Sequence, residues 1–455
     1  MSKKTKYKIK KRHQLGIVLM IIIIICMIPI YITENSLSKE KIIKEEKNIS
    51  KEELISSILS YNIVETVNKE FLEWISKEYS ISVLEELNNS LKQSQYNSQI
   101  WHNLTNNSLI VLQDQYNKIS NDKTKRISSQ NQSEITISFV GDVSLADNWY
   151  IMPKYDERNK KVYGILSEDV VNIMTSSDIM VANNEFTISN RGTKIPNKLY
   201  TFKASPERLT IYKEMGVDLV TLANNHIYDY GEEAFLDALD ALEEYDIPYI
   251  GAGRNLEEAK QPYYFIINGY KIGFVNATRA EKFILTKEAT ETNGGVLKCY
   301  DSTTFIQVIE DTKRHSDYVI ALVHWGREDS SELEQVQIDT AKQYIDAGAD
   351  VIVGSHAHTL QGIDFYKEKA IIYNLGDFIF NNETKDTGIF QLKINQDGTL
   401  QYYFKPCKER EEYTYLLTEE EQKRVLAKMS SLSPNVMIKE DGNFYQRENT
   451  SLTEN

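Results

Sequence analysis

Side chains that can bind a metal ion occur in short polar segments, each directly after an apolar, β-rich run. Four of the seven histidines lie in these segments, and His356 and His358 form a His-x-His pair after the run 351–353. Because side chains alternate along an extended chain, both imidazoles of this pair lie on one face. Imidazoles combined with carboxylates and amides suit Zn, Mn or Fe. The segments are Gly141-Asp142, Asn183-Asn184-Glu185, Asn224-Asn225-His226 with Asp229, His324-Trp325-Gly326, Gly354-Ser355-His356-Ala357-His358 and Gly376-Asp377.

These segments predict a transition-metal site where the strand ends meet. The alternative is that the polar residues only cap loops, but the recurrence of metal-binding side chains at separate strand ends favours the site. His13, His102 and His315 lie outside these segments and have no predicted role.

The elements that must bring these residues together are strands and helices that alternate along the chain. Alternation of this kind predicts an α/β domain with helices over the sheet faces. Short apolar runs predict strands at 135–140, 179–182, 219–222, 263–267, 272–275, 318–323, 351–353 and 370–373, and a final hairpin at 389–403. Helical spacing of apolar residues predicts helices at 167–174, 206–215, 232–244, 303–314 and 333–347.

The segment 14–32 has the composition of a transmembrane helix. It contains no charged residue, and its nineteen residues at about 1.5 Å each span roughly 30 Å, the thickness of the hydrocarbon core. Residues 1–13 carry seven basic residues and no acid, so they are expected in the cytoplasm and everything after residue 33 outside. A cleaved signal peptide is the alternative, but no small-residue cleavage site follows the apolar run. We therefore expect a single-pass signal anchor in the cell membrane.

The rest of the chain divides by composition into three parts. Residues 33–133 begin with a polar linker and continue with helical apolar spacing that no Gly or Pro interrupts from 51 to 119, so a helical stalk or linker region is expected. The main α/β domain is expected at 134–408. A partly helical and disordered tail is expected at 409–455.

The charge excludes one class of partner. The formal net charge is −14, so the part of the chain after residue 13 carries −21. Such a surface repels polyanions, and we expect no nucleic-acid binding. An acidic substrate would need metal ions or a local basic patch to overcome the same repulsion.

Cysteine and tyrosine usage adds two weaker expectations. Only Cys299 and Cys407 could form a disulfide in the folded part, since Cys26 lies in the apolar segment, and nothing in their spacing requires one. The 28 tyrosines are spread along the chain without a stacking stripe, which argues against a sugar- or peptidoglycan-binding module.

The order of the polar motifs resembles the CapA family of poly-γ-glutamate capsule synthesis proteins over residues 135–380. The resemblance does not extend to residues 1–133. That family is similar to calcineurin-like metallophosphoesterases, so the resemblance implies a four-layer α/β/β/α sandwich with a two-metal site. The matching motifs are Gly141-Asp142, Asn183-x-Glu185, Ala223-Asn224-Asn225-His226 with Asp229 and Gly231, His324-Trp325-Gly326, Gly354-x-His356-x-His358 with Gln361, and Leu375-Gly376-Asp377-Phe378.

The resemblance also implies a role for each site residue. His226 would protonate a leaving oxygen, and Asp229 would orient His226. Metallophosphoesterases usually have Asp-x-His at the first strand, where this chain has Asp142-Val143-Ser144, so the number of metal ions stays open. The implied metal ligands are Asp142 and His358 for the first ion, Glu185 between the two ions, and Asn225, His324 and His356 for the second.

Two functions of different class remain open. The first is a metal-dependent hydrolase or transferase in cell-surface polymer biosynthesis, acting on a phosphoester, an envelope glycopolymer, or an amide or isopeptide bond such as that of poly-γ-glutamate. The second is a non-catalytic component of a polymer synthesis or export complex, with membrane-bound synthase subunits and an anionic cell-surface polymer as partners. His226 in the place of a general acid favours the first, and the imidazole missing at Ser144 favours the second.

Overall fold

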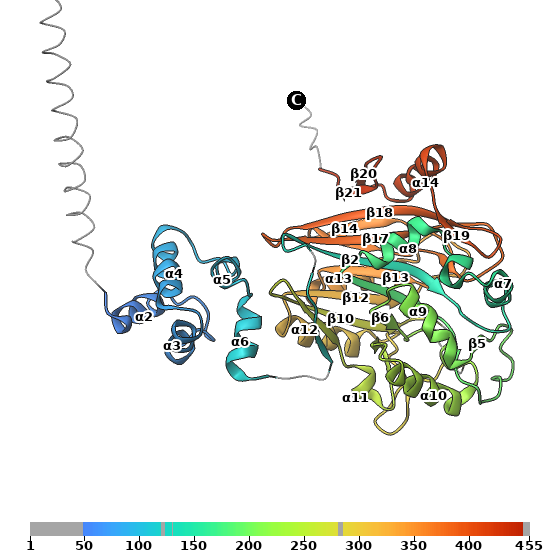
Figure 1. Cartoon of the computed structure of the whole chain (residues 1–455), viewed down its shortest axis with the longest axis horizontal. Helices are drawn as coiled ribbons and strands as arrows, with labels where there is room; N and C mark the ends of the chain where they lie inside the picture. The colour runs from blue at the N-terminus through green and yellow to red at the C-terminus, as the bar shows by residue number, and fades with distance from the viewer. Residues whose placement is uncertain (1–48, 120–122, 130, 281–284, 449–455) are drawn as a thin grey trace, which may run out of the picture. The chain divides into compact units, whose positions relative to one another are not determined.

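The computed structural model describes residues 49–119, 123–129, 131–280 and 285–448 (Figure 1). These residues belong to two compact units, the first ending at Tyr96 and the second beginning at Asn97. The expected cytoplasmic tail 1–13 and transmembrane segment 14–32 lie outside the described residues. Within the described ranges, no helix is both long enough and apolar enough to cross a membrane.

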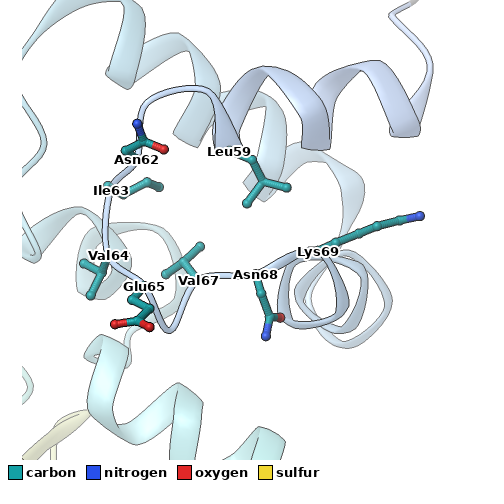
Figure 2. Close-up of a pocket in the computed structure, with 8 residues that line it drawn as sticks. All are labelled: Leu59, Asn62, Ile63, Val64, Glu65, Val67, Asn68 and Lys69. Atoms are coloured by element: carbon teal, nitrogen blue, oxygen red, sulfur yellow. The ribbon is translucent and has the colours of Figure 1, made fainter.

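The described part of the first unit contains three short amphipathic helices, as the apolar spacing predicts. They are α2 (Lys51–Leu59), α3 (Lys69–Glu78) and α4 (Ile81–Gln93). Ser50 and Glu53 form a capping box at the start of α2, and the Asn68 side chain caps α3. A cavity of about 490 Å³ lies beside the α2–α3 connection. Figure 2 shows the residues that line it, which are Leu59, Asn62, Ile63, Val64, Glu65, Val67, Asn68 and Lys69.

The second unit contains two large sheets. The seven-stranded sheet has the order β1 (Thr124–Arg126), β9 (Tyr263–Ile267), β10 (Tyr270–Thr278), β12 (Tyr318–His324), β13 (Val351–Ser355), β15 (Lys369–Ile372) and β14 (Ile363–Tyr366). The ten-stranded sheet has the order β20 (Val436–Ile438), β21 (Asn443–Gln446), β18 (Leu400–Glu409), β17 (Lys385–Asn395), β2 (Glu134–Val143), β3 (Ile179–Asn184), β6 (Leu219–Thr221) and β7 (Tyr249–Ile250), with β16 (Asp377–Ile379) on β2 and β19 (Thr414–Leu416) on β18. Two small sheets pair β4 (Thr187–Ile188) with β5 (Lys203–Ala204), and β8 (Ala252–Gly253) with β11 (Gly295–Val296).

Three apolar clusters show how these layers pack. The first cluster lies between the inner faces of the two sheets and includes Phe139, Phe274 and Phe390. The second covers the outer face of the ten-stranded sheet with α8 (Glu168–Thr175), α9 (Thr210–Glu214) and α10 (Gly231–Glu244). The third covers the outer face of the seven-stranded sheet with α12 (Thr303–Arg314) and α13 (Gln335–Asp346). Helices therefore flank two packed sheets, as expected for an α/β domain (Figure 1).

Residues 97–126 belong to the same compact unit as the sheets, which differs from the boundary expected at residue 134. Specific contacts join α5 (Gln99–Thr105) and α6 (Leu109–Asn117) to the seven-stranded sheet. The His102 ring stacks on Tyr270 at 4.2 Å between centroids, and Lys271 pairs with Asp114 at 2.7 Å. The helical spacing of these residues predicts helices, but it does not say which unit they pack against.

The tail also differs from expectation. Helix α14 (Glu419–Leu432) agrees with the helix predicted in the tail, but β20 and β21 follow it and extend the ten-stranded sheet through β18. Phe444 on β21 is buried between the sheets. These strands have only three and four residues, which is too short for an alternation signal. Cys299 and Cys407 are both buried and free.

Candidate metal centre

The residues singled out from the sequence meet at one edge of the two sheets. Strands β2, β3 and β6 run parallel in one sheet, and β10, β12 and β13 run parallel in the other. Asp142 near the end of β2 is in register with Asn183 of β3 and with Asp377 of β16. The carboxyl ends of parallel strands are where α/β domains build sites. Contacts join all eight predicted residues there, namely Asp142, Glu185, Asn225, His226, Asp229, His324, His356 and His358.

Two glycines let the backbone converge at this edge. A Cβ atom at Gly141 would lie 1.8 Å from the carbonyl oxygen of Gly376, and one at Gly354 would lie 1.9 Å from that of Tyr373. The following loop holds His356 and His358 at φ angles of 97° and 53°, in the left-handed region. Such conformations are uncommon for residues with a side chain and concentrate at functional sites.

One set of ligands, here called the His324 cluster, contains Glu185, Asn225, His324 and His356. The ligand atoms of Glu185, His324 and His356 all lie within 4.8 Å of one another. His324 Nε2 is 2.8 Å from Asn225 Oδ1 and 3.7 Å from Glu185 Oε1. Glu185 Oε1 and His356 Nδ1 are buried and have no hydrogen-bond partner among the residues that the structure describes. A bound cation would satisfy buried acceptor atoms that lie close together and have no donor.

A second set, here called the His358 cluster, contains Asp142, His358 and Asp377. His358 Nδ1 lies 2.7 Å from Asp377 Oδ1 and 3.3 Å from Asp142 Oδ2, while its Nε2 lies 3.7 Å from Glu185 Oε1. Glu185 therefore stands between the two clusters. The Asn183 side-chain amide donates to Asp142 Oδ1 at 2.8 Å and to Glu185 Oε2 at 3.1 Å, which fixes the spacing of the two carboxylates.

The electrostatics of the centre show a shortage of positive charge. Burial raises the pKa of Glu185 well above its usual range, and the charge of Asp142 raises it further. Burial alone would raise the pKa of Asp142, but hydrogen bonds with His358 and Asn183 hold it below its usual range. Burial opposes the charged form of His358, yet Asp377 and Glu185 raise its pKa well above normal. One cationic imidazole and the Lys385 ammonium, which lies 3.1 Å from Asp377, thus face three buried carboxylates, and a divalent cation would supply the missing charge.

The imidazoles of the His324 cluster are in the protonation state that a metal requires. Burial, together with the neighbouring charge of His358, lowers the pKa of His356 to about 3. Burial, followed by the charges of His356 and His358, also holds the pKa of His324 well below its usual value. Neutral imidazoles have a lone pair for a cation. The residues present therefore fit a divalent metal ion.

His226 lies beside both clusters and is held by a carboxylate. Its Nδ1 is 2.7 Å from Asp229 Oδ2, and its Nε2 is 4.0 Å from Glu185 Oε1. Asp229 also accepts from the backbone N–H of Phe202 at 2.8 Å and pairs with Lys198 at 2.8 Å. The Lys198 ammonium also donates a hydrogen bond to the Asn225 carbonyl. This lysine therefore connects Asp229, which holds His226, to the His324 cluster.

Ser144 lies two residues after Asp142, at the position where the resemblance described from the sequence implies an imidazole. It is fully buried, its N–H donates to the Ile379 carbonyl at 2.7 Å, and its Oγ has no partner among the described residues. Asp377 reaches the same cluster from β16, but both of its oxygens already contact donors, His358 at 2.7 Å and Lys385 at 3.1 Å. Asp377 is therefore better placed to orient His358 than to replace the missing imidazole.

Sequence reasoning missed four residues that shape the centre: Asn183, Lys198, Asp377 and Lys385. Asn183 and Asp377 lie in motifs quoted from the sequence, and these motifs indicate where the two residues lie but not what they do. Lys198 and Lys385 lie outside every motif, and only the fold brings their ammonium groups beside Asp229 and Asp377.

The fold and the centre define a class, namely α/β proteins with a buried set of imidazole and carboxylate ligands at the strand ends. Comparison of the sequence with protein families shows which family the chain matches. The bacterial capsule synthesis protein family PGA_cap matches residues 136–382, so the chain belongs to that family, which confirms the resemblance to CapA proteins.

Two curated relatives are 30% identical to this chain. The capsule biosynthesis protein CapA of Bacillus anthracis aligns over 284 residues, 60% of this chain and 67% of its own length. The PGA biosynthesis protein CapA of Bacillus subtilis aligns over 292 residues, 62% of this chain and 74% of its own length. Among solved structures, a 5'-nucleotidase from Candida albicans is 11% identical, with 61% of this chain and 52% of that chain covered and a TM-score of 0.32. That structural similarity is too low to support a functional argument.

Proposed function

We propose that this protein acts in the biosynthesis of a cell-surface polymer as a metal-dependent hydrolase or transferase with a metallophosphoesterase-like arrangement of layers. The observation that carries this proposal is the His324 cluster, in which buried ligand atoms without hydrogen-bond donors converge beside neutral imidazoles. Membership of the capsule synthesis family supports the biological process.

Each predicted residue has a task in this proposal. Glu185, Asn225, His324 and His356 hold one ion, and Asp142 and His358 hold a second where it is present. A divalent ion bound there supplies Lewis acidity toward an ester or amide oxygen. His226 delivers the proton to the leaving oxygen from Nε2, because Asp229 holds the opposite ring nitrogen and fixes the orientation of the imidazole. Mn, Zn and Fe all remain compatible with these ligands.

The location and the partners belong to the same proposal. The segment 14–32 anchors the chain in the cell membrane, with the α/β unit outside the cytoplasm, because the basic residues precede the apolar run. Membrane-bound synthase subunits and an anionic cell-surface polymer are the partners that such an anchor would bring within reach.

A specific observation favours a second candidate, a non-catalytic component of the synthesis or export complex. The His358 cluster lacks an imidazole at Ser144, and Asp377 is ion-paired with His358 and Lys385, which weakens it as a ligand for a first ion. A single ion in the His324 cluster could then serve to hold the loops in place.

The test is a chain that carries both His226→Ala and His356→Ala, expressed in the native cell in place of the wild type. The catalytic proposal predicts loss of surface polymer at unchanged protein level and unchanged folding. Normal polymer output from the double variant would show that catalysis at this centre is not needed and would reject the catalytic proposal. The exposed His315 gives the matched control, and His315→Ala is expected to leave polymer output unchanged.

A further inference from the structure

A pocket of about 230 Å³ opens beside the metal centre and includes His226 and His358 in its lining. The pocket lies below the range of roughly 300–1,000 Å³ that is typical of sites for drug-sized ligands. It therefore has room for one ring-sized unit rather than for a length of polymer. Its position gives that unit direct access to the residue proposed as the proton donor.

A continuous series of aromatic rings forms one wall of this pocket. Phe202 packs 4.4 Å from His226 and 4.9 Å from Trp149, measured between ring centroids. Trp149 in turn contacts Tyr150 at 4.6 Å and Tyr200 at 5.9 Å. Tyr150 and Tyr200 are 42% and 54% exposed, so the wall runs from the surface to the centre. Exposed aromatic faces in a small pocket beside a reactive site are suited to stacking against a ring.

The charged groups of the pocket do not suit a polyanion. Among the described residues that line it, Lys385 is the only lysine or arginine. Its ammonium is engaged by three carboxylates, Asp377 and Asp329 at 3.1 Å and Glu383 at 3.3 Å. Glu328 adds a further exposed carboxylate to the rim. A polyanion such as poly-γ-glutamate would meet net negative charge at this opening.

A cationic ligand is also a poorer match than a neutral one. The carboxylates of Asp329 and Glu383 already pair with the Lys385 ammonium, which leaves their remaining lone pairs to accept hydrogen bonds from neutral donors such as hydroxyl groups. The amides of Asn381 and Asn382 also line the pocket and add neutral polar groups to it. An aromatic wall together with neutral hydrogen-bonding groups matches a sugar, which has an apolar C–H face and a rim of hydroxyl groups.

We propose that this pocket is a subsite for an uncharged sugar ring and that the substrate of the centre is a glycan derivative rather than poly-γ-glutamate. The role of this subsite in a reaction rests on the proposed function, but sugar binding itself can be measured without catalysis. The aromatic residues of the pocket lie far apart in the sequence, at 149–150, 200–202 and 380, and the fold brings them together.

The test is a binding titration of the full chain in detergent with two uncharged probes, cellotriose and chitotriose, followed by Trp fluorescence and calorimetry. We expect either sugar to bind and to change the fluorescence, and Trp149→Phe to remove most of that change. Tyr200→Ala and Tyr150→Ala are expected to weaken binding by about tenfold each. Both tyrosines are exposed, so these variants should fold, and Tyr445→Ala on β21, 43% exposed in the wild type, is the matched control that should bind normally.

Two results would overturn the subsite. One is the absence of binding by both sugars, and the other is tighter binding of poly-γ-glutamate or tetramethylammonium that depends on Tyr150 and Tyr200. The metal content of the same samples separates this inference from the proposed function. A metal-loaded protein that binds no sugar rejects the subsite alone, whereas sugar binding by a protein that takes up no metal supports the subsite and rejects the metal-dependent function.

Discussion

His358 Nδ1 lies 2.7 Å from Asp377 Oδ1, and this contact turns the opposite ring nitrogen toward Glu185. Asp377 itself is fixed by Lys385 at 3.1 Å, so a carboxylate and a lysine on separate strands determine how one imidazole faces the centre. Hydrogen bonds of this kind set the orientation and basicity of a metal-binding histidine.

Asp377→Asn should therefore weaken divalent metal binding by about 10–100-fold, because the amide cannot stabilise the His358 ring as the carboxylate does. Metal titration of the full chain measures the change. Asp329→Asn is the control, since Asp329 also pairs with Lys385 but its side chain is 76% exposed. Equal metal affinity in Asp377→Asn and the wild type would show that Asp377 does not support the centre.

His226→Ala should separate proton transfer from metal binding. Because His226 is assigned no ligand role, metal content should stay at the wild-type level while turnover falls by about 10²–10⁴-fold. Hydrolysis of an activated phosphodiester such as bis(p-nitrophenyl) phosphate is a suitable first assay. Asp229→Asn should lower turnover in the same direction, since it removes the carboxylate that holds His226 Nδ1. Full activity in both variants would remove His226 from the mechanism.

Asp317 should make stability depend on pH. Burial raises the pKa of Asp317 to about 6 from 3.8, although the Lys271 N–H and the Ser108 hydroxyl oppose the shift by donating to the carboxylate. The folded state then binds this proton more tightly than the unfolded state, so the Asp317 contribution to stability falls as the pH rises from about 4 to about 6. Above about pH 6 this loss of stability is complete, and it amounts to at most about 3 kcal/mol.

Urea unfolding of the wild type and Asp317→Asn at pH 4.5 and pH 7.5 measures this contribution. The wild type should gain more stability than the variant on acidification, because the variant lacks the Asp317 carboxyl group. The same pH dependence in both proteins would contradict the assignment.

The unit that contains the sheets should require residues 97–133. A fragment of residues 97–455 keeps α5, α6 and β1, whereas a fragment of residues 134–455 loses the Ser108–Asp317 hydrogen bond, the Asp114–Lys271 pair and the pairing of β1 with β9. Thermal unfolding should show a Tm lower by at least about 5 °C in the shorter fragment. Equal Tm values would show that the helices only lie against the sheet without stabilising it.

Much of the α/β core could be predicted from the sequence because its signal is local. Long apolar runs such as 318–323 are strands that are buried on both faces, and the polar motifs directly after them mark the sheet edge. His356 and His358 were recognisable as a pair for the same reason. Helix α10 was predicted from its apolar spacing, which its buried residues Phe235, Leu239 and Leu242 confirm.

What the sequence could not predict depends on contacts between distant segments. Lys198 reaches Asp229 and Lys385 reaches Asp377 only in the folded chain, and neither lysine follows a strand-end motif. The three-residue strands β1 and β20 are specified by the partners that they meet, since three residues show no useful periodicity. The aromatic wall at Trp149 and Tyr200 likewise joins segments that have no pattern in common.

The most direct test of the account is the metal content of the full chain, purified in detergent without chelators and analysed for elements beside His356→Ala and His315→Ala. We predict at least one divalent transition-metal ion per chain in the wild type, loss of that ion in His356→Ala, and retention in His315→Ala. A folded wild type that remains metal-free after incubation with Mn, Zn and Fe salts would contradict the metal centre, as would full retention of the ion in His356→Ala.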